Sequence, residues 1–89
     1  MATKFQTNVK NSIDYSTGAF ADKVICHKDG TVTLKRYYFY RHGMTANIWA
    51  NQVSKVLIDA QIAFRIIEWR DDCKIWPTDS HFTVVVGPA

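Results

Sequence analysis

The stretch Val24-Ile25-Cys26-His27-Lys28-Asp29-Gly30-Thr31, continued by an aromatic run to Arg41, decides the fold. The residues on both sides of Asp29-Gly30 are rich in β-branched and aromatic side chains, which favour strands. An Asp-Gly pair between two such runs predicts a tight β-hairpin, because both central positions tolerate positive φ. We expect the second strand to leave the sheet at His42-Gly43.

A helix is predicted next. Thr45 is a good N-cap, since its hydroxyl can accept a hydrogen bond from a first-turn N–H group. The apolar residues that follow recur at helical spacing and form one continuous stripe, which we assign to the core. The stripe consists of Trp49, Val53, Val56, Leu57 and Ala60.

Two more strands are predicted after this helix. In residues 62–70, alternation places Phe64 and Ile66 on one face and the set Arg65, Ile67 and Trp69 on the other. The segment 71–80 contains Pro77 and turn-forming residues, and we interpret it as a loop. In residues 81–86 the same alternation directs Phe82, Val84 and Val86 inward.

The fold class predicted from these elements is α+β. We expect a mostly antiparallel sheet of four to five strands, ordered hairpin, helix, strand, strand, with one helix packed on one face. The chain would form a single domain over residues 1–89, with a ββαββ core over 23–86. Residues 1–22 are expected to form a poorly defined arm or an extra strand within Phe5–Tyr15. The sheet face without the helix would be partly wet or used for binding.

Length and composition limit the classes of function. A chain of 89 residues, 47% hydrophobic and 21% charged, has the composition of one folded domain. It contains no apolar run of the roughly 18 residues that a membrane span needs. The first residues show no apolar core of a signal peptide, so we expect a cytoplasmic protein without a membrane partner.

The net charge of +3 is unevenly distributed along the chain. Residues 23–55 contain six basic residues and one acid, whereas residues 56–89 contain three basic residues and five acids. This total is well below that of a dedicated nucleic-acid-binding domain, but a basic middle attracts phosphate or an acidic protein surface.

The second hairpin strand carries aromatic and basic side chains on both of its faces. Whichever face is exposed therefore presents large rings beside cations, an arrangement that suits a protein anchor or stacking on bases. Stabilisation of the sheet alone is the competing interpretation, because aromatic pairs also stabilise sheets. The predicted partner-binding residues are Lys35, Arg36, Tyr37, Tyr38, Phe39, Tyr40, Arg41, His42 and Trp76, and Trp69 could extend this surface.

Catalytic, metal and cofactor sites are not indicated. His42, at the end of a strand, is the best candidate for a general base, but no nucleophile, paired carboxylates or glycine-rich loop accompanies it. Cys26 and Cys73 lack the short ligand spacing of structural zinc sites, and Cys26 is expected to be a small core residue. The sequence therefore predicts a protein that is not an enzyme and holds no metal or cofactor.

Two segments carry a resemblance to a known group of proteins. They are Tyr37-Tyr38-Phe39-Tyr40-Arg41-His42-Gly43-Met44-Thr45 and Trp76-Pro77-Thr78-Asp79-Ser80-His81-Phe82-Thr83-Val84-Val85-Val86. An aromatic strand ending in His-Gly, a Thr-capped helix and a Trp-Pro loop before the last strand resemble small α+β proteins of phages and other mobile elements. The resemblance implies a viral protein that acts in the host cell as an inhibitor, as anti-CRISPR and other anti-defence proteins do.

The function predicted from the sequence is therefore binding. The protein would bind and block a host protein or nucleoprotein complex through the aromatic-basic sheet face. The alternative is a single-stranded nucleic-acid-binding protein that uses the same face as a stacking platform. A homodimer through an exposed edge strand is also compatible with the predicted sheet.

Overall fold

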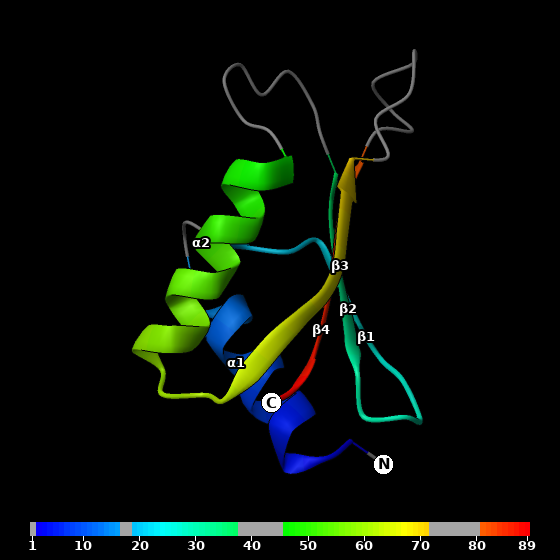
Figure 1. Ribbon diagram of the computed structural model, residues 1–89, viewed down its shortest axis with the longest axis vertical. Helices are drawn as coiled ribbons and strands as arrows, with labels where there is room; N and C mark the ends of the chain where they lie inside the picture. The colour runs from blue at the N-terminus through cyan, green and yellow to red at the C-terminus, as the bar shows by residue number, and fades with distance from the viewer. Residues whose placement is uncertain (1, 17–18, 38–45, 72–80) are drawn as a thin grey trace.

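The computed structural model describes residues 2–16, 19–37, 46–71 and 81–89. Two helices and four strands follow one another in the described chain: α1 (Lys4–Asp14), β1 (Lys23–Cys26), β2 (Val32–Tyr37), α2 (Ala46–Asp59), β3 (Phe64–Asp71) and β4 (His81–Pro88). The strands form one antiparallel sheet, which is seen nearly edge-on in Figure 1. Their order is β1-β2-β4-β3, so the last strand lies between the second and the third. The α+β class with a four-stranded antiparallel sheet is confirmed.

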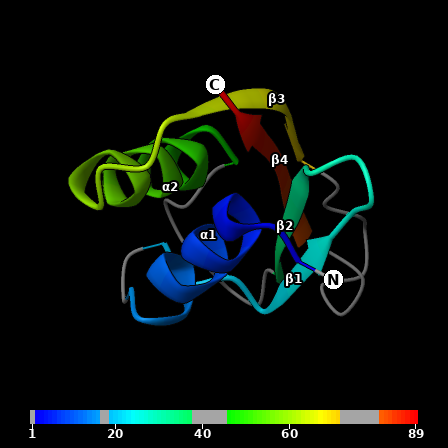
Figure 2. The same cartoon turned by 90° about the horizontal axis from the view of Figure 1, so that it is seen from below.

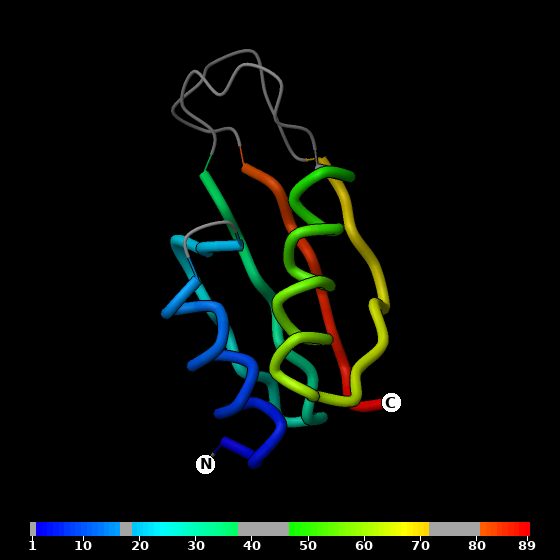
Figure 3. Tube along the Cα trace, turned by 90° about the vertical axis from the view of Figure 1, so that its left-hand side faces the viewer, coloured from blue at the N-terminus to red at the C-terminus, as the bar shows by residue number. Residues whose placement is uncertain are grey.

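Both helices lie on the same side of the sheet. Seen from below, α1 and α2 stand beside each other, with the curved sheet to one side of them (Figure 2). Seen through the helix layer, α1 crosses the β1–β2 half of the sheet and α2 crosses the β4–β3 half (Figure 3). The sequence predicted one covering helix, and the structure adds a second in the same layer. Among the described residues, no element covers the opposite face.

The first helix replaces the predicted extra strand or poorly defined arm, which was wrong. Thr3 caps the helix: its hydroxyl accepts a hydrogen bond from Gln6 N at 3.1 Å, and Gln6 Oε1 accepts one from Thr3 N at 2.9 Å. This reciprocal capping box satisfies two N–H groups that would otherwise lack partners. Val9 and Ile13, four residues apart on one side of the helix, are completely buried. Capping and helical periodicity therefore outweigh the strand propensity of the isolated apolar residues.

Gln6 also fastens α1 to the β1–β2 hairpin. Its side-chain Nε2 donates hydrogen bonds to the carbonyl oxygens of His27, at 2.7 Å, and Thr31, at 3.0 Å. Gln6 is only 1% exposed, and both the oxygen and the nitrogen of its side-chain amide have hydrogen-bond partners. A buried amide with all these bonds fixes the position of the helix relative to the hairpin, because breaking any of them leaves a polar group without a partner.

The hairpin forms as predicted, but its turn differs. His27 O accepts a hydrogen bond from Gly30 N at 3.1 Å, and His27 N donates to Thr31 O at 3.0 Å, which makes a three-residue loop. Only Gly30 in this loop has positive φ, at 92°. Asp29 instead accepts hydrogen bonds from the backbone N–H and the hydroxyl of Thr31, at 3.0 and 2.6 Å, so the turn needs one left-handed residue rather than two.

The core lies between the two helices and the sheet. Trp49, Val53 and Leu57 of the predicted stripe are completely buried and pack in the same cluster as Phe82 and Leu34. The prediction for these three residues is confirmed.

Two residues expected in the core are exposed. Ala60 follows the last helical residue, Asp59, and faces solvent. Cys26 is exposed because it belongs to the edge strand β1, whose helix-side residues are covered less than those of β2.

A bulge in β3 changes which face its later residues occupy. Ile66 is paired with Val86, whereas Glu68 is paired with the preceding residue, Val85, so Ile67 is an extra residue in the ladder. After the bulge, Trp69 is paired with the buried Val84 and lies on the helix side of the sheet. The predicted grouping of Trp69 with Arg65 and Ile67 was therefore wrong, since it assumed an uninterrupted alternation.

Candidate interaction surface

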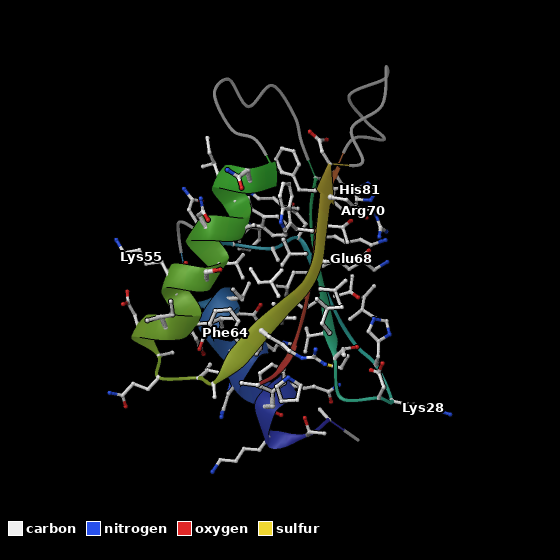
Figure 4. All side chains as sticks on the ribbon, viewed as in Figure 1. Lys28, Lys55, Phe64, Glu68, Arg70 and His81 are labelled. Carbon is white, nitrogen blue, oxygen red and sulfur yellow. The ribbon has the colours of Figure 1, made fainter. Side chains whose placement is uncertain are left out.

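The sheet face turned away from the helices is here called the open face. Its residues follow from the strand register, because side chains alternate and the opposite set, which includes Val32, Leu34, Val84 and Val86, is buried under the helices. In Figure 4 the side chains of Glu68, Arg70 and His81 lie on this side of the sheet, while Phe64 lies on the helix side. The strand residues of the open face are Lys23, Ile25, Thr33, Lys35, Tyr37, His81, Thr83, Val85, Gly87, Arg65, Ile67, Glu68 and Arg70.

A row of cations crosses the open face from one edge to the other. Lys23 on β1 is the cross-strand partner of Lys35 on β2, Lys35 is the partner of Thr83 on β4, and Thr83 is the partner of Arg70 on β3. Thr83 is 1% exposed, so only the cationic side chains of the row are presented to solvent. Lys23 and Lys35 stand directly opposite each other, and two like charges in this position destabilise a sheet slightly.

The open face carries the charge imbalance of the whole chain. It has four cations, Lys23, Lys35, Arg65 and Arg70, and one carboxylate, Glu68, which forms an ion pair with Arg70. The formal charge of this face is therefore +3, equal to the net charge of the sequence. The five other cations of the described residues are matched by five carboxylates: Lys4, Lys10, Lys28, Arg36 and Lys55 against Asp14, Asp22, Asp29, Asp59 and Asp71.

An aromatic pair borders the cationic row. Tyr37 and His81 are cross-strand partners whose rings meet edge to face, with centroids 5.9 Å apart and planes at 69°. The backbone N–H of Tyr37 donates a 2.8 Å hydrogen bond to the carboxylate of Asp22, which precedes β1. This bond occupies the donor at the end of β2, where the pairing with β1 has ended, and keeps Tyr37 in the sheet.

A more apolar stripe lies on the other side of the cationic row. Ile25, Thr33 and Val85 are successive cross-strand partners, and Ile67 in the bulge packs over Gly87. A Cβ atom at Gly87 would lie 3.0 Å from Cδ1 of Ile67, so the glycine lets Ile67 lie close to the sheet. Arg65, paired with Gly87, follows on the far side of the stripe. Cations therefore flank an apolar centre.

The predicted partner-binding residues fall into three groups. Lys35 and Tyr37 lie on the open face. Arg36 lies on the helix side, where its cross-strand partner is the buried Phe82. The others are outside the described residues: Tyr38, Phe39, Tyr40, Arg41, His42 and Trp76. Trp69, proposed to extend the surface, is on the helix side at the sheet edge.

Sequence reasoning missed most of the open face. Lys23, Arg65 and Arg70 come from three strands, and only the strand order brings them into line with Lys35. Arg65 could have been found from simple alternation in 62–70. Arg70 could not, because the two adjacent isoleucines at the bulge give no signal that the alternation shifts there.

The described residues contain no group of three His, Cys, Asp or Glu side chains that could hold a metal ion. His27 and His81 both belong to the open-face side, and His27 Nε2 lies 2.6 Å from Thr33 Oγ1. His42, the predicted candidate for a general base, and Cys73 are outside the described residues. The absence of catalytic activity, metal and cofactor therefore stays a prediction.

Comparison with known proteins gives no relative: no family model, no curated protein and no solved structure matches the chain. In the described segments, neither helix has the length and apolar character that a membrane crossing requires. The resemblance to phage and mobile-element proteins thus stays a prediction, as do the host-cell location and the homodimer.

Proposed function

We propose that the protein is a small non-enzymatic binding protein that docks an acidic surface of another protein against the open face of its sheet. The observation that carries the proposal is the concentration of a +3 formal charge on the one sheet face that the described helices leave uncovered. A cationic surface of this kind speeds encounter with an anionic partner and disfavours basic ones.

A protein partner fits the layout of the open face better than a nucleic acid does. Protein interfaces combine an apolar centre with a polar rim. The stripe of Ile25, Val85 and Ile67 supplies such a centre, and Lys35 and Arg65 lie on its two sides. Ile67 is 44% exposed, which leaves apolar area for a partner to cover.

The resemblance described above suggests the biological form of this binding. A phage- or mobile-element-encoded protein of this size would act by occupying a functional surface of a host protein or nucleoprotein complex. Inhibition of a defence system, as by anti-CRISPR proteins, belongs to this class. This part of the proposal rests on the resemblance and on the lack of a catalytic constellation in the sequence.

Single-stranded nucleic acid is the second candidate, favoured by the cationic row beside the Tyr37–His81 pair. Phosphate contacts of Lys and Arg with base stacking on an aromatic ring are the usual basis of such binding. Nucleic-acid binding of this kind would show a steep loss of affinity as the salt concentration rises, for oligonucleotides of any sequence. Titration of a labelled single-stranded oligonucleotide and of polyglutamate at low salt compares the two candidates directly.

The test of the proposal is a charge swap with a matched control. The variant Lys23→Glu/Lys35→Glu reverses two open-face charges, and Lys4→Glu/Lys55→Glu makes the same change in net charge on the helices. Proteins captured from nuclease-treated host lysate by wild type are identified, and the affinity for each purified candidate is then measured for all three proteins. We expect the open-face variant to lose at least tenfold in affinity and the helix variant to lose less than twofold. Equal loss in both variants would show that only the total charge matters and would contradict docking on this face.

A further inference from the structure

Among the described residues, the outer edge of β1 has backbone groups for which no hydrogen-bond partner is present. His27 N donates to Thr31 O across the hairpin, and hydrogen-bonded pairs alternate in an antiparallel ladder. Ile25 and Lys23 therefore bond to Thr33 and Lys35, whereas the N–H and C=O groups of Val24 and Cys26 point away from the sheet. Two donors and two acceptors in regular extended geometry are a template for one more strand.

The opposite edge of the sheet is protected against such pairing. β3 is interrupted by the bulge at Ile67 and carries the charged residues Arg65, Glu68 and Arg70. Bulges and charges are the devices that natural sheets use to prevent edge pairing. β1 has neither an irregularity nor more than one charge, at Lys23. Of the two edges, β1 is the one that can take a new strand.

We infer that β1 accepts an extended acidic segment of the partner as a fifth strand, in continuation of the open face. The inference rests on the proposed function, because the added strand would extend the surface that the partner contacts. On the open-face side, the new strand would place its alternate side chains beside Lys23, Ile25 and His27. Acidic, aliphatic and acidic side chains at positions i, i+2 and i+4 complement these three residues.

The helix side of the edge offers a place for one further side chain. A pocket of about 150 Å³ lies at the end of β1 and is lined by Ala2, Gln6, Cys26, His27 and Lys28. The residue of the new strand opposite Cys26 would project into this pocket. Lys28 adds a cation there, so both sides of the edge favour an acidic segment over a basic one.

A second copy of the chain fits this edge less well than an acidic segment. Antiparallel self-pairing centred on Ile25 would use the same four backbone groups. It would also place Lys23 of one copy beside His27 of the other and join two faces that each carry a charge of +3. An acidic segment instead places a carboxylate beside Lys23, where it gains attraction.

The test is amide hydrogen exchange in the ¹⁵N-labelled full-length protein. The probe is a seven-residue peptide with a central valine, glutamate two positions away on either side and threonine elsewhere. One control peptide has the same composition with the two glutamates adjacent, and another has lysine in place of glutamate. We expect the probe at saturation to slow exchange of the Val24 and Cys26 amides at least tenfold, with smaller effects of both controls. Lys23 and Ile25, already bonded to β2, would change little.

A variant provides a second readout. Val24→Pro removes one outward N–H group without removing a bond to β2, and proline is tolerated on edge strands. We expect it to lose at least tenfold in peptide affinity while the charge-swapped helix variant binds as wild type. If Val24→Pro does not fold, the exchange measurement on the wild-type protein still decides the question.

Three outcomes would overturn the inference, and they separate it from the proposed function. In the first, the peptide binds wild type and not Lys23→Glu/Lys35→Glu, but the amides of Val24 and Cys26 still exchange freely in the wild-type complex. The ligand would then lie on the open face alone, so strand addition would be wrong while the proposed function would stand. Protection of these amides that rises with protein concentration in the absence of peptide indicates self-pairing. In the third, neither the peptide nor polyglutamate binds, and Lys23→Glu/Lys35→Glu captures its partner as wild type does. This result would contradict the proposed function as well as strand addition.

Discussion

The covered and the open face of the sheet are made from alternate residues of the same strands, yet they are built on different physical principles. On β2 and β4 the covered face presents Leu34 and Val84, which are completely buried, and the open face presents Lys35 and Thr83 next to them. The covered face is stabilised by removal of apolar surface from water. The open face removes less apolar surface from water and carries most of its side chains as cations or polar groups. The position of the helices, and not the composition of any one strand, therefore decides which face of the sheet stays open.

The largest expected change in stability distinguishes two neighbouring valines of β4. Val84→Ala should lower the free energy of unfolding by about 2–3 kcal/mol, because buried methyl groups are lost and a cavity remains. Val85→Ala, on the open face, should cost about 1 kcal/mol or less, mainly through strand propensity. Chemical denaturation of both variants measures the difference. Equal losses would mean that the open face is as buried as the covered one.

A second prediction concerns the bond between α1 and the hairpin. Gln6→Met keeps the approximate volume but leaves the carbonyl oxygens of His27 and Thr31 with fewer donors, at a cost of about 2 kcal/mol. Thr7→Ala, at an exposed neighbouring position, is the control and should change stability by less than about 0.5 kcal/mol. Thermal unfolding of the two proteins tests this. Similar melting temperatures would show that α1 is held by its apolar residues alone.

These elements also show what could be predicted from the sequence. The hairpin, α2 and the inward residues of β4 were predicted because each is specified by local periodicity or turn chemistry. Helix α1 was missed although Thr3 and Gln6 form a capping box, since the few apolar residues of that segment were interpreted as a strand. Helix α1 is specified locally, by the capping box of Thr3 and Gln6 and by the four-residue spacing of Val9 and Ile13.

The location of the open face could not be predicted in the same way. Both faces of β2 combine aromatic and cationic residues, so local composition does not decide between Arg36 and Lys35. The cationic row depends on β4 lying between β2 and β3 and on the bulge at Ile67. Strand order and bulges result from packing of the whole chain, and no single segment encodes them.

A smaller change in stability is expected at the bulge, where Ile67 contacts Gly87 on the open face. Gly87→Ala would bring a Cβ atom to 3.0 Å from Cδ1 of Ile67, and we expect a loss of about 1 kcal/mol. Since Ile67 is partly exposed, it can move outward and keep the cost low. In Ile67→Ala the same glycine substitution should cost much less, which a double-mutant cycle by denaturation measures. Additive effects would contradict the contact across the open face.

The smallest expected effect is a pH dependence at the hairpin turn. The hydrogen bonds from the Thr31 hydroxyl and backbone N–H lower the pKa of Asp29 below its ordinary value of 3.8. A lowered folded-state pKa contributes stability above the ordinary pKa, and this contribution is lost as the pH falls through the folded-state value. The difference in melting temperature between wild type and Asp29→Ala should therefore be larger at pH 6 than well below pH 3.8. A difference independent of pH would show that the carboxylate charge has no part in the turn.

The most direct test of an uncovered cationic face is the solvent accessibility of the two sheet faces, measured by methyl NMR with a soluble paramagnetic agent and no partner present. We expect strong relaxation enhancement for the methyl groups of Ile25, Ile67 and Val85 and little for those of Leu34 and Val84. Equal protection of both sets would show that another part of the chain covers the cationic face, and docking on that face would then be excluded.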